Sequence, residues 1–507
     1  MSREVAIVGA GPAGLAAARW LLAQGFEPVL LEAADGPGGQ WRHDNPLSGV
    51  WPDMRTNTSR LVTRFSDLDY PPGTAVFPHN REVLAHLEAY AARFGIDQRL
   101  RTHATVERLE RAPGGWRLAW REAGQAREQI FPRVVVASGR FNTPYAPEVP
   151  GLESFTGEVI HTFDYSGPEV FRGRRVAVAG GAISALEVAC DMAMAGADVT
   201  IACRRQRYVV PKISGGVPID SRFSRYGANA GETLPADELA RRLKAWLLRH
   251  GGDPARHGAP APADDPREAG AALSQYFLGL LAEGRIAARP WMSRIEGERI
   301  AFADGAQEPF DAIVWGTGFE LRIPFLSDEI RQVLDMDGQY IDLADFTFHP
   351  QLEGLAFLGM IPQTGPYFPV LELQARWLAY AWGGACPAPS AEHMAEGLAE
   401  YRRARSGPLI QPMHAVAMRF ARLAGVEPDP SDSPGIARAL LFGPLTAAAF
   451  RLTGPDALPD AKEVIAREGV IHGTADGAAF TAEEQGLVRE LAAASSDPKV
   501  KAWAGLL

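Results

Sequence analysis

Two stretches of the chain share one arrangement of apolar and small residues. Residues 5–8 form a short apolar run typical of a buried strand, and residues 15–22 continue with helical character after a glycine-rich turn. Residues 176–179 and 184–196 repeat this order, and a further apolar strand ends near Ile201. The repeated strand, turn and helix predict an α/β fold with two Rossmann-like nucleotide-binding domains.

The first turn carries the complete pattern GxGxxG. Gly9 permits the turn, Gly11 lets the backbone approach a pyrophosphate, and Gly14 lets the helix and strand pack, while free N–H groups at the helix start attract the anion. The next strand ends in Glu32, which is placed to bind the hydroxyl pair of a ribose. The bare glycine pattern also occurs in turns without a ligand, but strand, helix and acid are all present here. The predicted contacts are Gly9, Gly11, Pro12, Ala13, Gly14 and Glu32.

The second turn departs from that pattern. Gly180 holds the turn, but Ala182 replaces the middle glycine and Ala185 replaces the last one. In place of an acid, the following strand leads to Arg204 and Arg205, which would attract the 2′-phosphate of NADPH. The alternative is that the two arginines lie solvated on a surface loop and bind no phosphate. We expect the enzyme to prefer NADPH over NADH. We also expect the methyl group of Ala182 to weaken the retention of this coenzyme. The predicted contacts are Gly180, Ser184, Ala185, Arg204 and Arg205.

Two more apolar strands indicate where the chain passes between the units. One precedes a Pro-rich exit after Ser138, and the other ends in Gly-Thr-Gly near Thr317. This order predicts that the second domain is inserted in the first. The predicted parts are residues 1–150, residues 151–318 with an exposed or mobile Pro/Ala/Gly-rich loop at 249–270, and residues 319–507, which complete the first domain and add a C-terminal helical region.

Composition excludes several classes of protein. The chain has 507 residues, of which 46% are hydrophobic and 22% charged, as in soluble proteins of two or three domains. A net charge of −10 without a Lys/Arg-rich run argues against nucleic acid as a partner. Cys190, Cys203 and Cys386 are scattered, so we expect no disulfide framework and no metal site. No apolar stretch reaches membrane-spanning length, and we predict a cytoplasmic protein without a membrane anchor.

A string between the two units, FTGEVIHTFDY at 155–165, fits neither the helical period nor strand alternation. Its Phe155, Gly157, His161 and Tyr165 match the pattern FxGxxxHxxxY/F, the fingerprint of flavin-containing monooxygenases. The chain therefore resembles this family. The related Baeyer-Villiger monooxygenases have a similar pattern but a tryptophan at the last position.

Further stretches resemble the same family over nearly the whole chain. GGQW at 38–41 is similar to its flavin loop, RTNTSR at 55–60 to its Thr-Asn stretch, and WGTGF at 315–319 to its hinge. LELQARW at 371–377 and the block at 441–455 also match. The resemblance implies FAD in the first domain and NADPH in the second. The contacts that it implies are Gly39, Gln40, Trp41, Thr56, Asn57, Thr58, Thr317, Gln374 and Arg376.

The resemblance also implies a reaction. NADPH reduces FAD, O2 is captured as a C4a-hydroperoxyflavin, and the distal oxygen passes to a soft nitrogen or sulfur of a small molecule. The implied catalytic residues are Asn57, beside the flavin and nicotinamide, and His161, which positions NADPH. From the residues alone, Asn57 is equally a turn or N-cap asparagine.

Other classes stay open at this point. A Baeyer-Villiger enzyme acting on ketones is the first alternative, and only the last fingerprint residue and general likeness argue against it. An NADPH oxidase that releases hydrogen peroxide, or a redox-dependent binding module, is the second. A disulfide reductase is disfavoured because no cysteine pair is present. A homodimer is neither indicated nor excluded.

Overall fold

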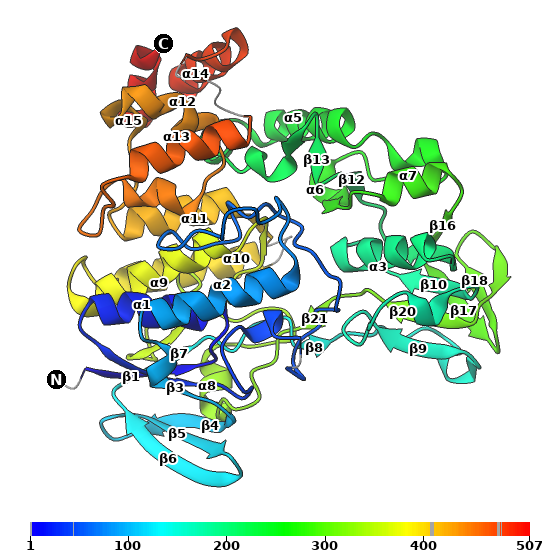
Figure 1. Ribbon diagram of the computed structural model, residues 1–507, viewed down its shortest axis with the longest axis horizontal. Helices are drawn as coiled ribbons and strands as arrows, with labels where there is room; N and C mark the ends of the chain where they lie inside the picture. Colours follow the sequence, from blue (N-terminus) through cyan, green and yellow to red (C-terminus); the bar gives the residue numbers. More distant parts are fainter. Residues whose placement is uncertain (1–2, 44, 406–409, 474–476, 478) are drawn as a thin grey trace.

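The computed structural model describes residues 3–43, 45–405, 410–473, 477 and 479–507. Figure 1 shows two sheets on opposite sides of the molecule, with helices packed over each of them. The C-terminal helices are stacked above the first sheet, on the side of α1 and α9. The molecule thus has two α/β parts and one helical part.

The first sheet is parallel and has the order β22-β7-β1-β2-β3. Val8, at the end of β1, is in register with Leu31 on one side and Val136 on the other. A strand with neighbours on both sides and covered faces is apolar throughout, which explains the run at 5–8. The strands are β1 (Glu4–Val8), β2 (Glu27–Leu31), β3 (Leu100–Arg101), β7 (Arg133–Val136) and β22 (Leu355–Phe357), and helix α1 (Pro12–Ala23) follows β1.

The second sheet is also parallel, with the order β16-β11-β10-β20-β9. All its strands lie in the sequence between β7 and β22. The predicted architecture, two Rossmann-like domains with the second inserted in the first, is therefore confirmed, while the boundaries at 150 and 318 stay predictions. The strands are β9 (Glu158–His161), β10 (Arg175–Ala179), β11 (Asp198–Cys203), β16 (Ile286–Pro290) and β20 (Ala312–Trp315), and helix α3 (Ile183–Met194) follows β10.

The two crossings between the domains run side by side. Strand β8 (Thr143–Pro144) pairs antiparallel with β21 (Phe319–Glu320). The N–H of Tyr145 donates to the carbonyl of Gly318 at 3.0 Å, and the hydroxyl of Thr317 donates to the carbonyl of Tyr145. Thr317 thus joins the outgoing and returning chain.

Smaller elements complete the two α/β parts. One antiparallel sheet consists of β4 (Ala104–Ala112), β5 (Gly115–Glu122) and β6 (Gln125–Phe131), and another of β17 (Met292–Glu296), β18 (Arg299–Phe302) and β19 (Gln307–Pro309). Three short strand pairs are β12 (Tyr208–Val210) with β15 (Ala271–Leu273), β13 (Ile213–Ser214) with β14 (Val217–Pro218), and β23 (Gln363–Thr364) with β24 (Gln411–Pro412). Further helices are α2 (Asn80–Arg93), α4 (Arg225–Thr233), α5 (Ala236–His250), α7 (Phe277–Ala282) and α8 (Asp328–Val333).

The segment 249–270 differs from its prediction as an exposed or mobile loop. It contains the 3-10 helix η6 (Pro254–His257) and the short helix α6 (Pro266–Ala269), each capped by the aspartate that precedes it. Pro254 and Ala259 are buried, as is Ala269. The Pro- and Asp-rich composition therefore encodes two capped helical turns within a segment that is otherwise a partly exposed loop.

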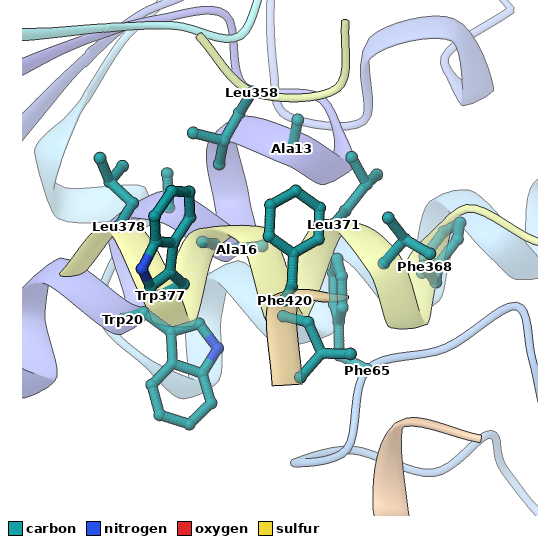
Figure 2. Close-up of a cluster of buried hydrophobic side chains, with 14 of the residues drawn as sticks. Ala13, Ala16, Trp20, Phe65, Leu358, Phe368, Leu371, Trp377, Leu378 and Phe420 are labelled. Carbon is teal, nitrogen blue, oxygen red and sulfur yellow. The ribbon is translucent and has the colours of Figure 1, made fainter. Parts of the chain in front are cut away.

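The main core lies where α1 meets α9 (Phe368–Gly383). Figure 2 shows small side chains of α1, such as Ala13 and Ala16, on the side of α9 that carries Leu371 and Leu378. Alanines let the two helices approach closely, and the indole of Trp20 then contacts Tyr380 edge to face at 6.0 Å. This packing fixes α1, whose first turn points toward the candidate site.

The C-terminal helices are bound to the first domain by buried charge pairs. Arg451 pairs with Asp67 at 2.8 Å, and Arg64 pairs with Glu468. Both pairs reach the loop segment that follows residues 55–60. These helices are α10 (Ala391–Ala404), α11 (Met413–Leu423), α12 (Ala437–Phe442), α13 (Ala461–Ile471), α14 (Ala482–Ala494) and α15 (Pro498–Ala502). No helix in the described ranges is long and apolar enough to cross a membrane.

Candidate functional site

A cavity of about 690 Å³ lies beside the first turn and extends to the inserted domain. Its lining comes from the turn after β1, the end of β2, the loops at 39–63 and 137–143, the start of α9, and the segments at 210–246 and 271–273. Most lining residues are apolar, as is usual for a cofactor or substrate pocket. Predicted contacts that line it are Gly9, Gly11, Pro12, Ala13, Glu32, Gly39, Gln40, Trp41, Thr56, Asn57 and Thr58.

The glycines of the first turn are required by close backbone contacts. Gly9 has a φ of +101°, and a Cβ on Gly14 would lie 2.0 Å from the carbonyl oxygen of Gly9. Gly14 lies under the turn rather than on the cavity. Gly11 and Gly39 face each other, since a Cβ on Gly39 would lie 2.8 Å from the Cα of Gly11. No side chain caps α1, so its first N–H groups are available to an anion in the cavity.

Glu32 is buried at the edge of the cavity, and its orientation is fixed by the backbone. One carboxylate oxygen accepts from the N–H of Ala10 at 2.7 Å, and the other accepts from the N–H of Ala34 at 2.9 Å. A carboxylate has about four lone-pair sites, so both oxygens keep acceptor capacity. This arrangement suits a ribose hydroxyl pair.

The flavin-loop motif forms the 3-10 helix η1 (Gly39–Trp41). The amide of Gln40 donates to the carbonyl of Phe141 at 2.5 Å. This bond ties the loop to the first crossing segment, on the opposite wall of the cavity. Trp41 is partly exposed and lines the cavity, with its other face packed on the core.

Asn57 stands out among the polar residues of the cavity. Its Oδ1 atom is buried and has no hydrogen-bond partner in the described ranges. Its neighbours are satisfied, because the hydroxyl of Thr56 donates to the carbonyl of Thr58 at 2.8 Å and the N–H of Ser59 donates to Asp220. A buried acceptor without a partner costs about 1–3 kcal/mol, so the loop holds Asn57 in an arrangement that protein contacts alone do not satisfy.

His161 lies at the end of β9, and the cavity lining does not include it. Its Nδ1 accepts from the N–H of Phe163 at 3.0 Å, its Nε2 is buried without a partner in the described part of the chain, and its ring contacts Phe319 edge to face. Burial lowers the pKa of His161 below its usual value. His161 therefore lies by the domain crossing, outside the cavity that Asn57 lines.

The rest of the fingerprint string packs the inserted domain together. A Cβ on Gly157 would lie 2.5 Å from the carbonyl oxygen of Asp311, so only glycine fits there. The hydroxyl of Tyr165 donates to Asp191 on α3 at 2.7 Å. The irregular spacing of the string thus reflects a short strand that ends in a loop against α3.

The second turn has a different environment from the first. Gly180 has a φ of +133° and touches the second crossing, but Ala182 is exposed at the N-cap of α3. Arg204 and Arg205 are also exposed, and the guanidinium of Arg204 lies over the ring of Trp291 at 4.7 Å. Of this turn and its helix, only Ile183 lines the cavity. Ser184 lies next in the first turn of α3, and Ala185 is buried under the turn.

Besides Gly14 and the predicted contacts of the second turn, three further predicted contacts lie away from the cavity, namely Thr317 in the crossing and Gln374 and Arg376 on α9. Gln374 is fully buried and accepts from the N–H of Gly359, which does line the cavity. Arg376 lies over Trp20 and donates to the carbonyl of Phe450 at 2.7 Å. Gln374 thus supports the wall of the cavity from behind, whereas Arg376 joins α9 to α1 and to the segment at Phe450.

Sequence reasoning missed the cavity residues Arg140, Arg222 and Tyr367. Arg140 and Tyr367 lie near the flavin-like motifs, yet no spacing rule singles them out. Arg222 belongs to a segment of the inserted domain without a motif. In the described ranges, no group of three or more His, Cys, Asp or Glu could hold a metal ion.

Comparison with known proteins agrees with this geometry. The family described as flavin-binding monooxygenase-like matches residues 2–469. The chain belongs to this family. It is therefore an enzyme that uses a flavin and O2 to oxygenate a small molecule.

Relatives of this flavin monooxygenase are similar over most of their length. Flavin-containing monooxygenase 5 of Oryctolagus cuniculus is 29% identical over 505 residues, covering 91% of each chain. Dimethylaniline monooxygenase (N-oxide-forming) 2 of Rattus norvegicus is 28% identical over 497 residues, covering 92% of this chain and 91% of its own.

Two solved structures share the fold. The S-allyl-L-cysteine S-oxygenase from Allium sativum has a TM-score of 0.63 at 23% identity, covering 84% of this chain and 89% of its own. A cyclohexanone monooxygenase with bound epsilon-caprolactone has a TM-score of 0.62 at 18% identity, covering 83% of this chain and 98% of its own. Both similarities support the architecture with two nucleotide-binding domains.

The cavity of this flavin monooxygenase suits the cofactor of its family. Gly11 and Gly39 bring two backbone segments of the cavity lining into close contact, and α1 begins beside them without a side-chain cap. Asn57 offers a buried acceptor that lacks a protein partner. The start of α1 and the amide oxygen of Asn57 therefore fit a bound flavin, which could occupy both.

Proposed function

We propose that this protein is an FAD- and NADPH-dependent monooxygenase that transfers one oxygen atom, through a C4a-hydroperoxyflavin, to a soft nitrogen or sulfur of a small molecule. The observation that carries the proposal is one cavity lined both by the turn with Glu32 and by the unsatisfied amide oxygen of Asn57. The N-oxide-forming name of the rat relative and the S-oxygenase name of the garlic structure support a nitrogen or sulfur substrate.

The residues of the first turn would hold FAD. The uncapped N–H groups of α1 would bind its pyrophosphate, and Glu32 would bind its ribose hydroxyls. Bound FAD would supply the redox chemistry and the activation of O2. Trp41, the last residue of η1, would form a flat wall of the pocket.

Asn57 would act on the coenzyme side of the reaction. Its amide can accept and donate at once, so it would hold the nicotinamide and provide a fixed hydrogen bond where oxygen reacts. The mostly apolar lining would exclude water from this point. NADPH would bind to the inserted domain, with Arg204 and Arg205 at its 2′-phosphate and His161 in a supporting position at the crossing.

Turnover with three kinds of substrate tests this proposal. The purified flavoprotein is given NADPH and O2 with a tertiary amine, a thioether or a ketone, and NADPH, peroxide and product mass are measured. We expect an N-oxide or sulfoxide that accounts for most of the NADPH. An ester from the ketone alone would favour the Baeyer-Villiger alternative, and peroxide equal to all the O2 consumed would favour an uncoupled oxidase.

A further inference from the structure

Arg222 is a charged residue in an apolar part of the cavity. It is the last residue of the 3-10 helix η5 (Ile219–Arg222), and the neighbouring lining includes Phe223, Trp246 and Leu273. Its guanidinium lies over the ring of Trp246 at 4.3 Å and over that of Phe223 at 5.4 Å. The two aromatic rings hold the positive charge at the wall of the cavity.

No carboxylate neutralises Arg222 in the described ranges. Two more deeply buried arginines do have such a partner: Arg225 pairs with Glu427 at 2.8 Å, and Arg451 pairs with Asp67 at 2.8 Å. For Arg222, burial is the cause that lowers its pKa, to about 10, so the group still carries its charge at neutral pH. Arg222 is half-buried, and an anion that enters the cavity would form a charge-assisted pair with it.

The carboxylates of the same helix and of the same cavity are engaged elsewhere: Asp220 accepts from the N–H of Ser59 and lies 3.1 Å from His472, and Glu32 accepts from the backbone of Ala10 and Ala34. The nearest titratable rings on packed elements are His250 and His414, and the pKa of each is lowered by burial and by the charge of Arg222. Elsewhere in the cavity, Arg322 is paired with Glu320, and Arg140 donates to a backbone carbonyl. The N–H groups of the Arg222 guanidinium, in the lining of the cavity, are thus available to a ligand.

We propose that Arg222 binds a negatively charged group of the organic substrate, so that this enzyme prefers soft nucleophiles that carry a carboxylate. The planar guanidinium matches a carboxylate through two parallel hydrogen bonds. This inference rests on the proposed function for the identity of the reacting atom. A phosphate of the coenzyme offers the same chemistry, and the test separates the two sources.

The test compares matched ligands with and without charge. Methylthiobutanoate and its neutral amide, methylthiobutanamide, are compared as substrates by their kcat/KM values. Hexanoate and hexanamide, which cannot be oxygenated at sulfur, are compared by calorimetric binding to the flavin-loaded protein. The variants are R222M, R222K and the control R241M, since Arg241 pairs with Glu238 on the exposed side of α5.

We expect the carboxylates to be favoured about 10- to 100-fold over the amides, the range of a charge-assisted pair. The preference should vanish in R222M, persist in part in R222K and be unchanged in R241M, with the KM for NADPH constant throughout. Equal binding of hexanoate and hexanamide to the unmodified protein would overturn the inference. A rise in the KM for NADPH in R222M with the ligand preference intact would overturn it too and assign Arg222 to the coenzyme. If hexanoate is preferred through Arg222 but neither thioether is oxygenated, the anion site stands and the proposed reaction is wrong.

Discussion

The two nucleotide turns of this protein share a strand, a turn and a helix, but they differ in what surrounds them. The first turn is enclosed, with Gly11 against the loop at Gly39 and with Glu32 buried behind it. The second turn is open, with Ala182 and the arginines at 204 and 205 exposed. An enclosed site suits a cofactor that stays bound, and an open site suits a coenzyme that exchanges at each turnover.

The largest effect is expected from a substitution that fills the close backbone contact under the first turn. Gly14→Ala would place a methyl carbon 2.0 Å from the carbonyl of Gly9, and we expect loss of flavin and destabilisation by about 3 kcal/mol or more. Gly486→Ala is the matched control, because that glycine lies within α14 with nothing near its Cβ, and it should gain about 0.5–1 kcal/mol. Flavin absorbance and urea unfolding measure both results. A yellow, stable Gly14→Ala protein would contradict the enclosed geometry.

Removing the flavin should have the next largest effect on stability. A ligand present at a thousand times its Kd stabilises a protein by about 4 kcal/mol, and an enclosed cofactor reaches that regime easily. We expect flavin-free protein to melt well below the flavin-loaded form, whereas adding NADP should raise the melting temperature only slightly. Scanning calorimetry of the forms decides this. If NADP raised the melting temperature more than flavin does, the contrast between an enclosed first turn and an open second turn would be wrong.

The open turn is expected to control coenzyme choice. Neutralising Arg204 and Arg205 together to glutamine should reduce the preference for NADPH over NADH by about 10- to 100-fold, mainly through KM, because charge-assisted bonds to the 2′-phosphate are lost. Flavin content should not change. Arg294→Gln is the control, because Arg294 is exposed on β17. Equal use of both coenzymes by the unmodified enzyme would rule out this role.

A smaller effect is expected from Ala182→Gly. The methyl group of Ala182 is exposed at the N-cap of α3, where glycine is better tolerated than alanine. We expect NADP to bind a few times more tightly, with no loss of flavin or stability. Calorimetric titration with NADP measures the change. Unaltered binding would mean that the coenzyme pyrophosphate does not approach this position.

Local backbone requirements explain which features could be predicted from the sequence. Gly9, Gly14 and Glu32 follow from a turn that any such nucleotide domain must build, so their pattern is visible in a few residues. Gln374 and Arg376 could not be placed correctly, because the face of α9 that meets the core depends on α1, hundreds of residues away.

Long-range pairing explains what else the sequence did not reveal. Buried Arg225 finds a carboxylate from a distant segment, and only the folded structure shows that half-buried Arg222 has none among the described residues. The helices within 249–270 were hidden for a related reason, since proline and aspartate occur both in open loops and at helix starts.

The most direct test of the account is the fate of oxygen in Asn57→Ala. If Asn57 completes the flavin site, the variant should keep flavin and NADPH oxidation but lose about 10²- to 10³-fold in the rate of product formation, with peroxide replacing product. Its stability should not fall, because the amide oxygen removed has no protein partner in the described ranges. Rapid mixing of the reduced, NADP-bound variant with O2, followed by assay of product and peroxide, gives the result. Unchanged product yield, or a loss of about 1 kcal/mol in stability with full activity, would make Asn57 a structural residue and contradict the account.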